Sequence, residues 1–316
     1  MAYKISGTKN DTARIFVVDE TTNTLETQVL VSGTGSYEIT GLVAGRKLVA
    51  ARKSDGKSLA CGYIDPIYYF APGNRGVFGG GSTGSDSNVI DHITISTLGN
   101  AIDFGDLTGG RQWLAACSSS TRGIFGGGYA TASINVMDYI TISTIGNAID
   151  FGDLTVARYG CPGSCSSSTR GVFGGGYTEV GGVGLNVIDY IAIATIGNAI
   201  DFGDLTVARW GVAACSSPTR GVFGGGSTGV NIIEYITIST ASNTSDFGDL
   251  TVGRYYLSAC SSSTRGVFGG GISTNNIIDY ITISTTGNAT DFGDLTVARR
   301  RLTACSNSTR GVFGGG

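Results

Sequence analysis

The sequence predicts an all-β protein in which a small N-terminal β-sandwich is followed by a β-propeller of four-stranded blades. The main observation is a repeat: the phrase Arg-Gly-[Val/Ile]-Phe-Gly-Gly-Gly occurs six times, with successive copies starting 45 to 50 residues apart. A second observation is that the segments between the copies are rich in β-branched residues and show no helical periodicity. Repeats of this length without helical pattern are typical of arrays of small β-sheets. The copies begin at Arg75, Arg122, Arg170, Arg220, Arg265 and Arg310.

Composition argues against nucleic acid and membrane as partners. The chain has 316 residues, of which 52 are glycine, and its formal net charge is −3. The absence of a basic run argues against a nucleic-acid partner. The first residues lack the apolar core of a signal peptide, and no apolar run approaches the ~18 residues of a membrane span. We therefore expect a soluble protein without membrane insertion that is not exported by the standard route.

Five of the seven cysteines occupy one equivalent position in the repeat. Equivalent positions in different blades are too far apart for the roughly 4.4–6.8 Å Cα separation of a disulfide. These thiols are therefore predicted to be free and buried, in a protein made in a reducing compartment. They are Cys117, Cys165, Cys215, Cys260 and Cys305.

Residues 1–66 read as short strands separated by turn sequences, residues 67–74 as a linker and residues 75–316 as the repeat array. Alternation such as Tyr37 and Ile39 with polar neighbours indicates a sheet with one buried face. The segment 35–56 resembles the carboxypeptidase-regulatory or transthyretin-like family. The resemblance implies a β-sandwich that attaches or positions other domains, with no catalytic residue. It is carried by Gly35, Tyr37, Ile39, Gly41, Leu42, Gly45, Asp55 and Gly56.

Each repeat divides into four runs, which in one complete unit are about 158–165, 170–176, 186–195 and 199–205. Four consecutive antiparallel strands form one blade of a propeller. The first run consists of small residues, as the crowded innermost strand requires. The glycines that close the second run allow positive φ and a close approach of neighbouring backbone.

One unit also resembles the kelch repeat, which has an arginine after the fourth strand, a diglycine, a tyrosine and a large aromatic residue followed by leucine. Phenylalanine stands where kelch repeats have tryptophan, so the array is kelch-like. The wording RGVFGGG, IDYITI and GNATDFGDL is similar to repeat proteins of tailed bacteriophages, and this resemblance implies a virion or tail-fibre protein. The kelch positions in this unit are Arg158, Gly175, Gly176, Tyr190, Phe202 and Leu205.

The predicted strands of the array amount to five blades and one extra second strand. Residues 75–81 and 310–316 would then compete for one place in a five-bladed ring. Either one copy is displaced, or the chain stops within a longer array of six to eight blades. The end at Gly316, without a polar cap, favours truncation.

Motifs suggestive of catalysis or metal binding have structural explanations. The Asp-Phe-Gly phrase occurs five times without any other kinase motif, so it is predicted to form a bulge on the fourth strand. Pairs such as Asp201 and Asp204 could bind calcium, but bonds to turn amides or to the following arginine are preferred. The single histidine, His92, stands at the tyrosine position of its unit and is predicted to pack there. We expect no enzyme activity, no metal and no cofactor, although carboxylate chemistry stays formally open.

The loops between the second and third runs differ most among the units, and a constant scaffold with variable loops is typical of recognition. The alternative is that these turns merely tolerate change. The candidate binding residues are Asp86, Tyr129, Tyr177, Glu179, Thr228 and Asn275.

The sequence thus favours a non-enzymatic phage virion protein, a tail fibre or surface decoration, made in the host cytoplasm. Its N-terminal domain would bind other virion proteins, and its propeller would recognise a host-surface glycan or receptor. We also expect a homo-oligomer. The main alternative is a free multivalent lectin with five equivalent sites, and a third is a hydrolase with carboxylates in the propeller mouth.

Overall fold

The computed structural model describes residues 74–82, 84–160, 163–272 and 276–316, with Thr228 described by its backbone alone. Of residues 1–73 it describes six strands. The chain divides into two compact units, Met1–Tyr69 and Phe70–Gly316, which we describe separately.

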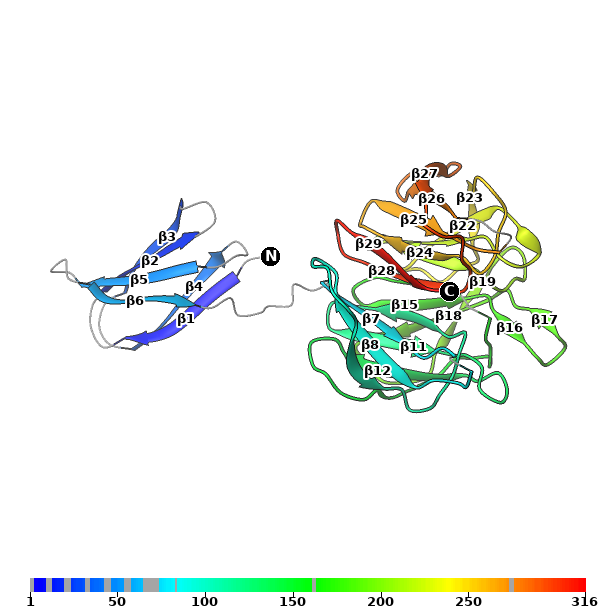
Figure 1. The fold of residues 1–316 in the computed structure, drawn as a ribbon, viewed down its shortest axis with the longest axis horizontal. Helices are drawn as coiled ribbons and strands as arrows, with labels where there is room; N and C mark the ends of the chain where they lie inside the picture. Colours follow the sequence, from blue (N-terminus) through cyan, green and yellow to red (C-terminus); the bar gives the residue numbers. More distant parts are fainter. Residues whose placement is uncertain are drawn as a thin grey trace. The chain divides into compact units, whose positions relative to one another are not determined.

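The first unit forms two antiparallel sheets (Figure 1). One pairs β1 with β4, and the other has the order β3-β2-β5-β6. Tyr37 and Ile39 lie on β4, as the alternation predicted. The packing of a sandwich and the family resemblance stay predictions, and residues 67–73 of the expected linker lie outside the described residues. The strands are β1 (Tyr3–Lys9), β2 (Ala13–Asp19), β3 (Thr24–Val31), β4 (Gly35–Leu42), β5 (Lys47–Lys53) and β6 (Ser58–Ile64).

The second unit is a five-bladed β-propeller (Figure 1), and four of its blades are described as four-stranded antiparallel sheets. In the part of the chain that the structure describes, the only helical element is the 3-10 turn η1 (Ser227–Gly229). Three described strands form the first blade: β7 (Arg75–Gly79), β8 (Val89–Thr94) and β9 (Ile102–Asp106). The second blade contains β10 (Ala115–Ser118), β11 (Arg122–Gly126), β12 (Val136–Thr141) and β13 (Ile149–Asp153). The third contains β14 (Gly163–Ser166), β15 (Arg170–Gly174), β18 (Val187–Ala192) and β19 (Ile200–Asp204), with the small hairpin β16 (Tyr177–Thr178) and β17 (Val183–Gly184) between them.

The remaining strands continue this pattern. The fourth blade contains β20 (Ala213–Ser216), β21 (Arg220–Gly224), β22 (Ile232–Thr237) and β23 (Ser245–Asp249). The fifth contains β24 (Ser258–Ser261), β25 (Arg265–Gly269), β26 (Ile277–Thr282) and β27 (Thr290–Asp294). A two-stranded sheet, β28 (Leu302–Ser306) and β29 (Gly311–Gly315), follows.

The first strand of each complete blade is the innermost, as its small residues predicted. Neighbouring inner strands lie side by side from β10 through β14, β20 and β24 to β28. A repeated serine links them: the hydroxyl of Ser166 donates to the carbonyl of Ser118 at 2.7 Å, and that of Ser216 donates to the carbonyl of Ser166 at 2.9 Å. A small side chain at this position therefore both fits the crowded axis and bridges adjacent blades.

The expectation that residues 75–81 and 310–316 compete for one place was wrong. Strands β7 and β29 take separate, successive places, and β28 lies beside both β24 and β7 (Figure 1). The Arg310 guanidinium donates to the carbonyl of Ile95 at 2.9 Å, the same inter-blade bond that Arg122 makes to Ile193 at 2.8 Å. Because both ends of the array make ordinary inter-blade contacts, the pair β28–β29 closes the ring between the fifth and first blades.

The Asp-Phe-Gly phrase forms the predicted bulge. The register of β12 and β13 shifts opposite Gly152, whose φ is 134°. Phe151 is fully buried, and its carbonyl accepts a 2.9 Å hydrogen bond from Gly197 in the next blade. This glycine is required because a Cβ at Gly152 would lie 2.6 Å from the backbone of Gly197.

The tyrosine of the third strand packs as predicted. Tyr190 lies edge-on to Phe202, with 5.9 Å between ring centroids, and the guanidinium of Arg170 lies over its ring at 4.3 Å. His92 replaces this tyrosine in the first blade and lies edge-on to Phe104 at 5.7 Å. The histidine is therefore a packing residue with the geometry of the tyrosines.

The five repeated cysteines are free, and all but the partly exposed Cys305 are buried. Each thiol faces a glycine of the next sheet; a Cβ on Gly221, for example, would lie 2.4 Å from Sγ of Cys165. Burial raises the pKa of Cys117 and of Cys260 to about 12 and that of Cys305 to about 11. The pKa values of Cys165 and Cys215 are raised by burial and, secondarily, by neighbouring thiols.

The raised pKa values of these five cysteines predict that the propeller loses stability at alkaline pH. The unfolded chain loses its thiol protons above a pKa of about 9, whereas the folded chain keeps them until about 11 to 12. The contribution of these thiols to the free energy of unfolding is therefore fully present below pH 9. It falls as the pH rises above 9, by up to about 1.4 kcal/mol per pH unit for each thiol. Urea unfolding between pH 8 and pH 11 tests this. The variant Cys165→Ala should show a smaller pH dependence, and an unchanged slope would contradict the prediction.

Candidate functional site: the axial aromatic cluster

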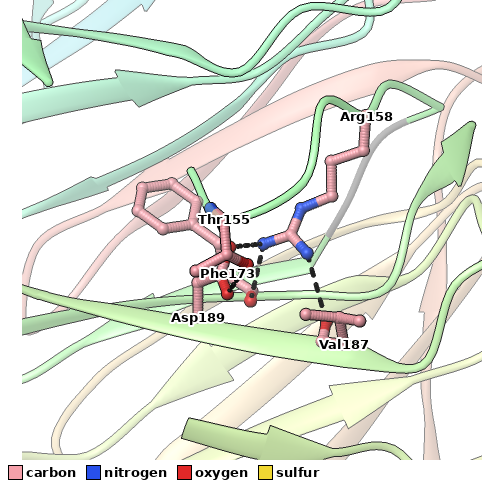
Figure 2. Close-up of polar contacts among 5 residues, drawn as sticks. All are labelled: Thr155, Arg158, Phe173, Val187 and Asp189. Atoms are coloured by element: carbon pink, nitrogen blue, oxygen red, sulfur yellow. Dashed lines mark hydrogen bonds and ion pairs between the residues drawn. The ribbon is translucent and has the colours of Figure 1, made fainter. Parts of the chain in front are cut away.

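Buried ion pairs fix the segments that enter each blade. The Arg158 guanidinium, which follows β13, lies 2.8 Å from a carboxylate oxygen of Asp189 on β18 of the next blade, and both side chains are fully buried (Figure 2). Arg158 also donates to the carbonyls of Phe173 and Val187, and Asp189 accepts from Thr155 (Figure 2). The other pairs are Arg111–Asp138, Arg209–Glu234 and Arg254–Asp279.

These arginines are structural. Burial lowers the pKa of Arg158, and the nearby Asp189 carboxylate opposes that shift. Burial likewise raises the pKa of Glu234, against the effect of Arg209. The Asp-x-x-Asp carboxylates were expected to bond to turn amides or to the following arginine. The turn amide is found at Asp291, which accepts from the amide of Gly293 at 3.2 Å, whereas the arginine as partner was wrong. The segment crosses to the following blade, so the guanidinium reaches the acid on that blade's third strand.

The two residues after each arginine lie where the segment turns into the inner strand, and the second of them has a left-handed backbone. Its φ is 57° at Trp113, 58° at Tyr256 and 57° at Arg301. These are the three non-glycine residues with positive φ in the described parts of the chain, and such a conformation costs about 1–3 kcal/mol each. The equivalent positions in the other units are glycines, Gly160 and Gly211, with φ of 84° and 66°.

Backbone hydrogen bonds connect these turns from blade to blade. The amide of Gly211 donates to the carbonyl of Gly160 at 2.7 Å, that of Tyr256 to Gly211 at 3.0 Å, and that of Arg301 to Tyr256 at 2.9 Å. The turns therefore form a continuous arc at one end of the inner strands. Side chains attached to this arc are held in fixed positions relative to one another.

Seven aromatic side chains gather on this arc and on the loops beside it, and we call them the axial aromatic cluster. Ring centroids are 5.6 Å apart for the stacked pair Trp113 and Tyr159, and 5.0 Å apart for Tyr129 and Tyr159. On the other side of the arc, Trp210 lies 5.1 Å from Tyr256. All seven side chains are partly exposed. The members are Trp113, Tyr129, Tyr159, Tyr177, Trp210, Tyr255 and Tyr256.

Contacts between successive rings make the cluster continuous. Tyr177 bridges its two halves, because its ring lies 5.4 Å from that of Tyr159 and 6.3 Å from that of Trp210. Tyrosine and tryptophan combine an apolar face with a polar group, which suits a surface that contacts a hydrated ligand. The cluster is part of the surface. Two recesses of about 240 and 140 Å³ lie at other loops, near Tyr139 and His92.

The predicted loop residues have different positions relative to this cluster. Tyr129 and Tyr177 belong to it, and each pairs with the entering segment through a backbone bridge. Glu179 is exposed at its border, where its carboxylate accepts from the amide of Ser133 at 3.4 Å. Burial and, secondarily, the charge of Glu179 raise the pKa of Tyr159.

The other three predicted residues make no described contact with the cluster. Asp86 is partly buried in the first blade, where it bridges to Ser82. Thr228 lies in η1, and Asn275 lies outside the described residues.

Sequence reasoning missed the residues of the entering segments. The signal was present, because the two residues after each arginine vary as much as the loops do: Gln-Trp, Tyr-Gly, Trp-Gly, Tyr-Tyr and Arg-Arg. Both tryptophans of the chain, Trp113 and Trp210, stand there.

The described residues contain no group of three or more His, Cys, Asp or Glu side chains placed to hold a metal ion. None of their helices is long and apolar enough to cross a membrane. Comparison of the sequence with known protein families and with curated proteins found no match.

Proposed function

We propose that this protein is a non-enzymatic virion component of a tailed bacteriophage, a tail fibre or surface decoration, which recognises carbohydrate on the host surface. The single observation that carries the recognition role is the axial aromatic cluster. Sugar rings present C–H faces that pack against aromatic side chains, and their hydroxyls bond to tyrosine and tryptophan. The assignment to a phage rests on the similarity of the repeated sequence phrases to those of phage repeat proteins.

The rest of the chain has a supporting role in this proposal. The six-stranded N-terminal unit would bind other virion proteins and so place the propeller on the particle. Assembly as a homo-oligomer would multiply weak individual contacts with the host surface into firm adhesion.

The alternative is a free lectin with equivalent sites in every blade. The cluster itself argues against equivalence, because Gln112 and Arg300 stand where other units have Tyr159, Trp210 and Tyr255. These differences favour one extended, asymmetric surface over five identical sites. A hydrolase with a carboxylate centre has no supporting observation in the described residues.

A glycan array probed with the full chain tests this function. We expect selective binding to a set of oligosaccharides, and a loss of about 30-fold in affinity for Trp210→Ala, because truncating a tryptophan at the centre of a contact surface costs ~2 kcal/mol. The control is Leu98→Ala, since Leu98 is 96 % exposed on a loop between third and fourth strands and lies outside the cluster. Absence of binding to any glycan, or equal losses in both variants, would contradict the proposal.

A further inference from the structure

We infer that the aromatic cluster includes an anion-binding group, the guanidinium of Arg301, which binds the carboxylate of an acidic saccharide. This inference rests on the proposed function and names its ligand class.

Arg301 is held in place by two aromatic rings. Its guanidinium carbon lies 4.9 Å from the ring centroid of Trp113 and 4.7 Å from that of Tyr256. Cation–π contacts with both rings fix the plane of the guanidinium and leave its N–H edge available to a ligand. The side chain is exposed, and within the described parts of the chain it forms no ion pair. The repeated arginines that pair with carboxylates, such as Arg158, are by contrast fully buried.

The backbone at this site argues for a role beyond folding. Trp113, Tyr256 and Arg301 meet here, and among the described residues they are also the three other than glycine with positive φ. The repeat folds with glycine at the same position, as Gly160 and Gly211 show, so the fold does not require large side chains there. The strained backbone at these positions brings an arginine and two aromatic side chains into contact. Because the fold does not need this strain, it points to a binding site.

The exposed cations stand on the side of the cluster where Arg301 lies between Trp113 and Tyr256. Arg300, which precedes Arg301, is exposed as well. The carboxylate seen at the cluster border, Glu179, lies beside Ser133 and Tyr159. A ligand lying on the rings of Trp113 or Tyr256 would therefore meet the guanidinium of Arg301.

A carboxylated sugar fits both the exposed guanidinium of Arg301 and the aromatic rings beside it. A planar guanidinium donates two parallel hydrogen bonds to a carboxylate, while the sugar ring packs on the neighbouring aromatic face. An acidic peptide could satisfy the charge, but it would not need the row of partly exposed rings that continues from Trp113 to Tyr159. The test below separates the two.

Calorimetric titration of the full chain with an oligosaccharide of glucuronic acid and with its neutral glucose counterpart tests the inference. We expect at least about tenfold tighter binding of the acidic form, as a charge-assisted bidentate pair would supply. Arg301→Gln should remove this preference, so that this variant binds the acidic and the neutral form with equal affinity. Arg301→Lys should keep part of it, and the control Arg300→Gln most of it.

A second variant separates binding from folding. Arg301→Gly introduces the residue that the repeat uses at this position, so we expect a chain that still unfolds in one cooperative thermal transition but has lost the acidic preference. Equal affinity of the wild-type chain for both saccharides, an acidic preference that survives in Arg301→Gln, or tight binding of an oligoglutamate peptide would overturn the inference and leave carbohydrate recognition standing. Binding of neither saccharide, together with an empty glycan array, would overturn both.

Discussion

Replacement of Asp189 by asparagine is expected to lower the free energy of unfolding by about 3–5 kcal/mol. The change leaves the fully buried guanidinium of Arg158 without the carboxylate 2.8 Å away, and an unpaired buried charge is among the largest single-site penalties known. Urea unfolding followed by tryptophan fluorescence measures this effect, since both tryptophans, Trp113 and Trp210, lie in the propeller.

Asp91 provides the matched control. It occupies the same position of the first blade, on β8 opposite Asp103, but it is only partly buried and has no arginine partner among the described residues. Asp91→Asn should therefore change the free energy of unfolding by less than about 1 kcal/mol. Similar losses in the two variants would show that the carboxylate matters for a reason other than its pairing with arginine.

Replacement of Gly152 by alanine should destabilise the propeller more than the same change at Gly293. Both glycines stand in the Asp-Phe-Gly bulge, with φ of 134° and 135°, so alanine meets the same backbone strain at each. A Cβ at Gly152 would lie 2.6 Å from the backbone of Gly197 in the next blade, whereas a Cβ at Gly293 would have no described atom within 4 Å. We expect about 1 kcal/mol of strain at Gly293 and a further 1–3 kcal/mol at Gly152.

The comparison isolates the contact between blades from local conformation. Thermal or urea unfolding of the two variants gives the difference directly. Equal destabilisation would mean that the bulge glycine is needed for its backbone angle alone, and that the approach of the next blade contributes nothing.

The fold was predictable because its determinants repeat. Six copies of one phrase reveal the unit, and small residues such as those around Cys215 identify the inner strand. The placement of β29 was not predictable, because strand counting alone does not show how many places the ring has. Inter-blade contacts such as that of Arg310 with Ile95 decide this, and they join residues 215 positions apart in the chain.

The proposed binding surface was only partly predictable for a related reason. Tyr129 and Tyr177 were identified because the loops that carry them vary. Trp113 and Arg301 stand two residues after constant arginines. Glycine at the same position in two other units, Gly160 and Gly211, is a signal for a left-handed turn, but it does not show that the two side chains meet. Their meeting at one end of the ring depends on closure by β28, which places the start of the array beside its end.

Tryptophan fluorescence during saccharide titration tests the central claim most directly. The chain has two tryptophans, and both belong to the axial aromatic cluster, so the emission reports on this surface alone. With oligosaccharides of glucose and of glucuronic acid, we predict a saturable change in emission whose midpoint equals the calorimetric dissociation constant. Heat of binding with unchanged emission would place the ligand elsewhere and contradict the assignment of this cluster as the recognition surface.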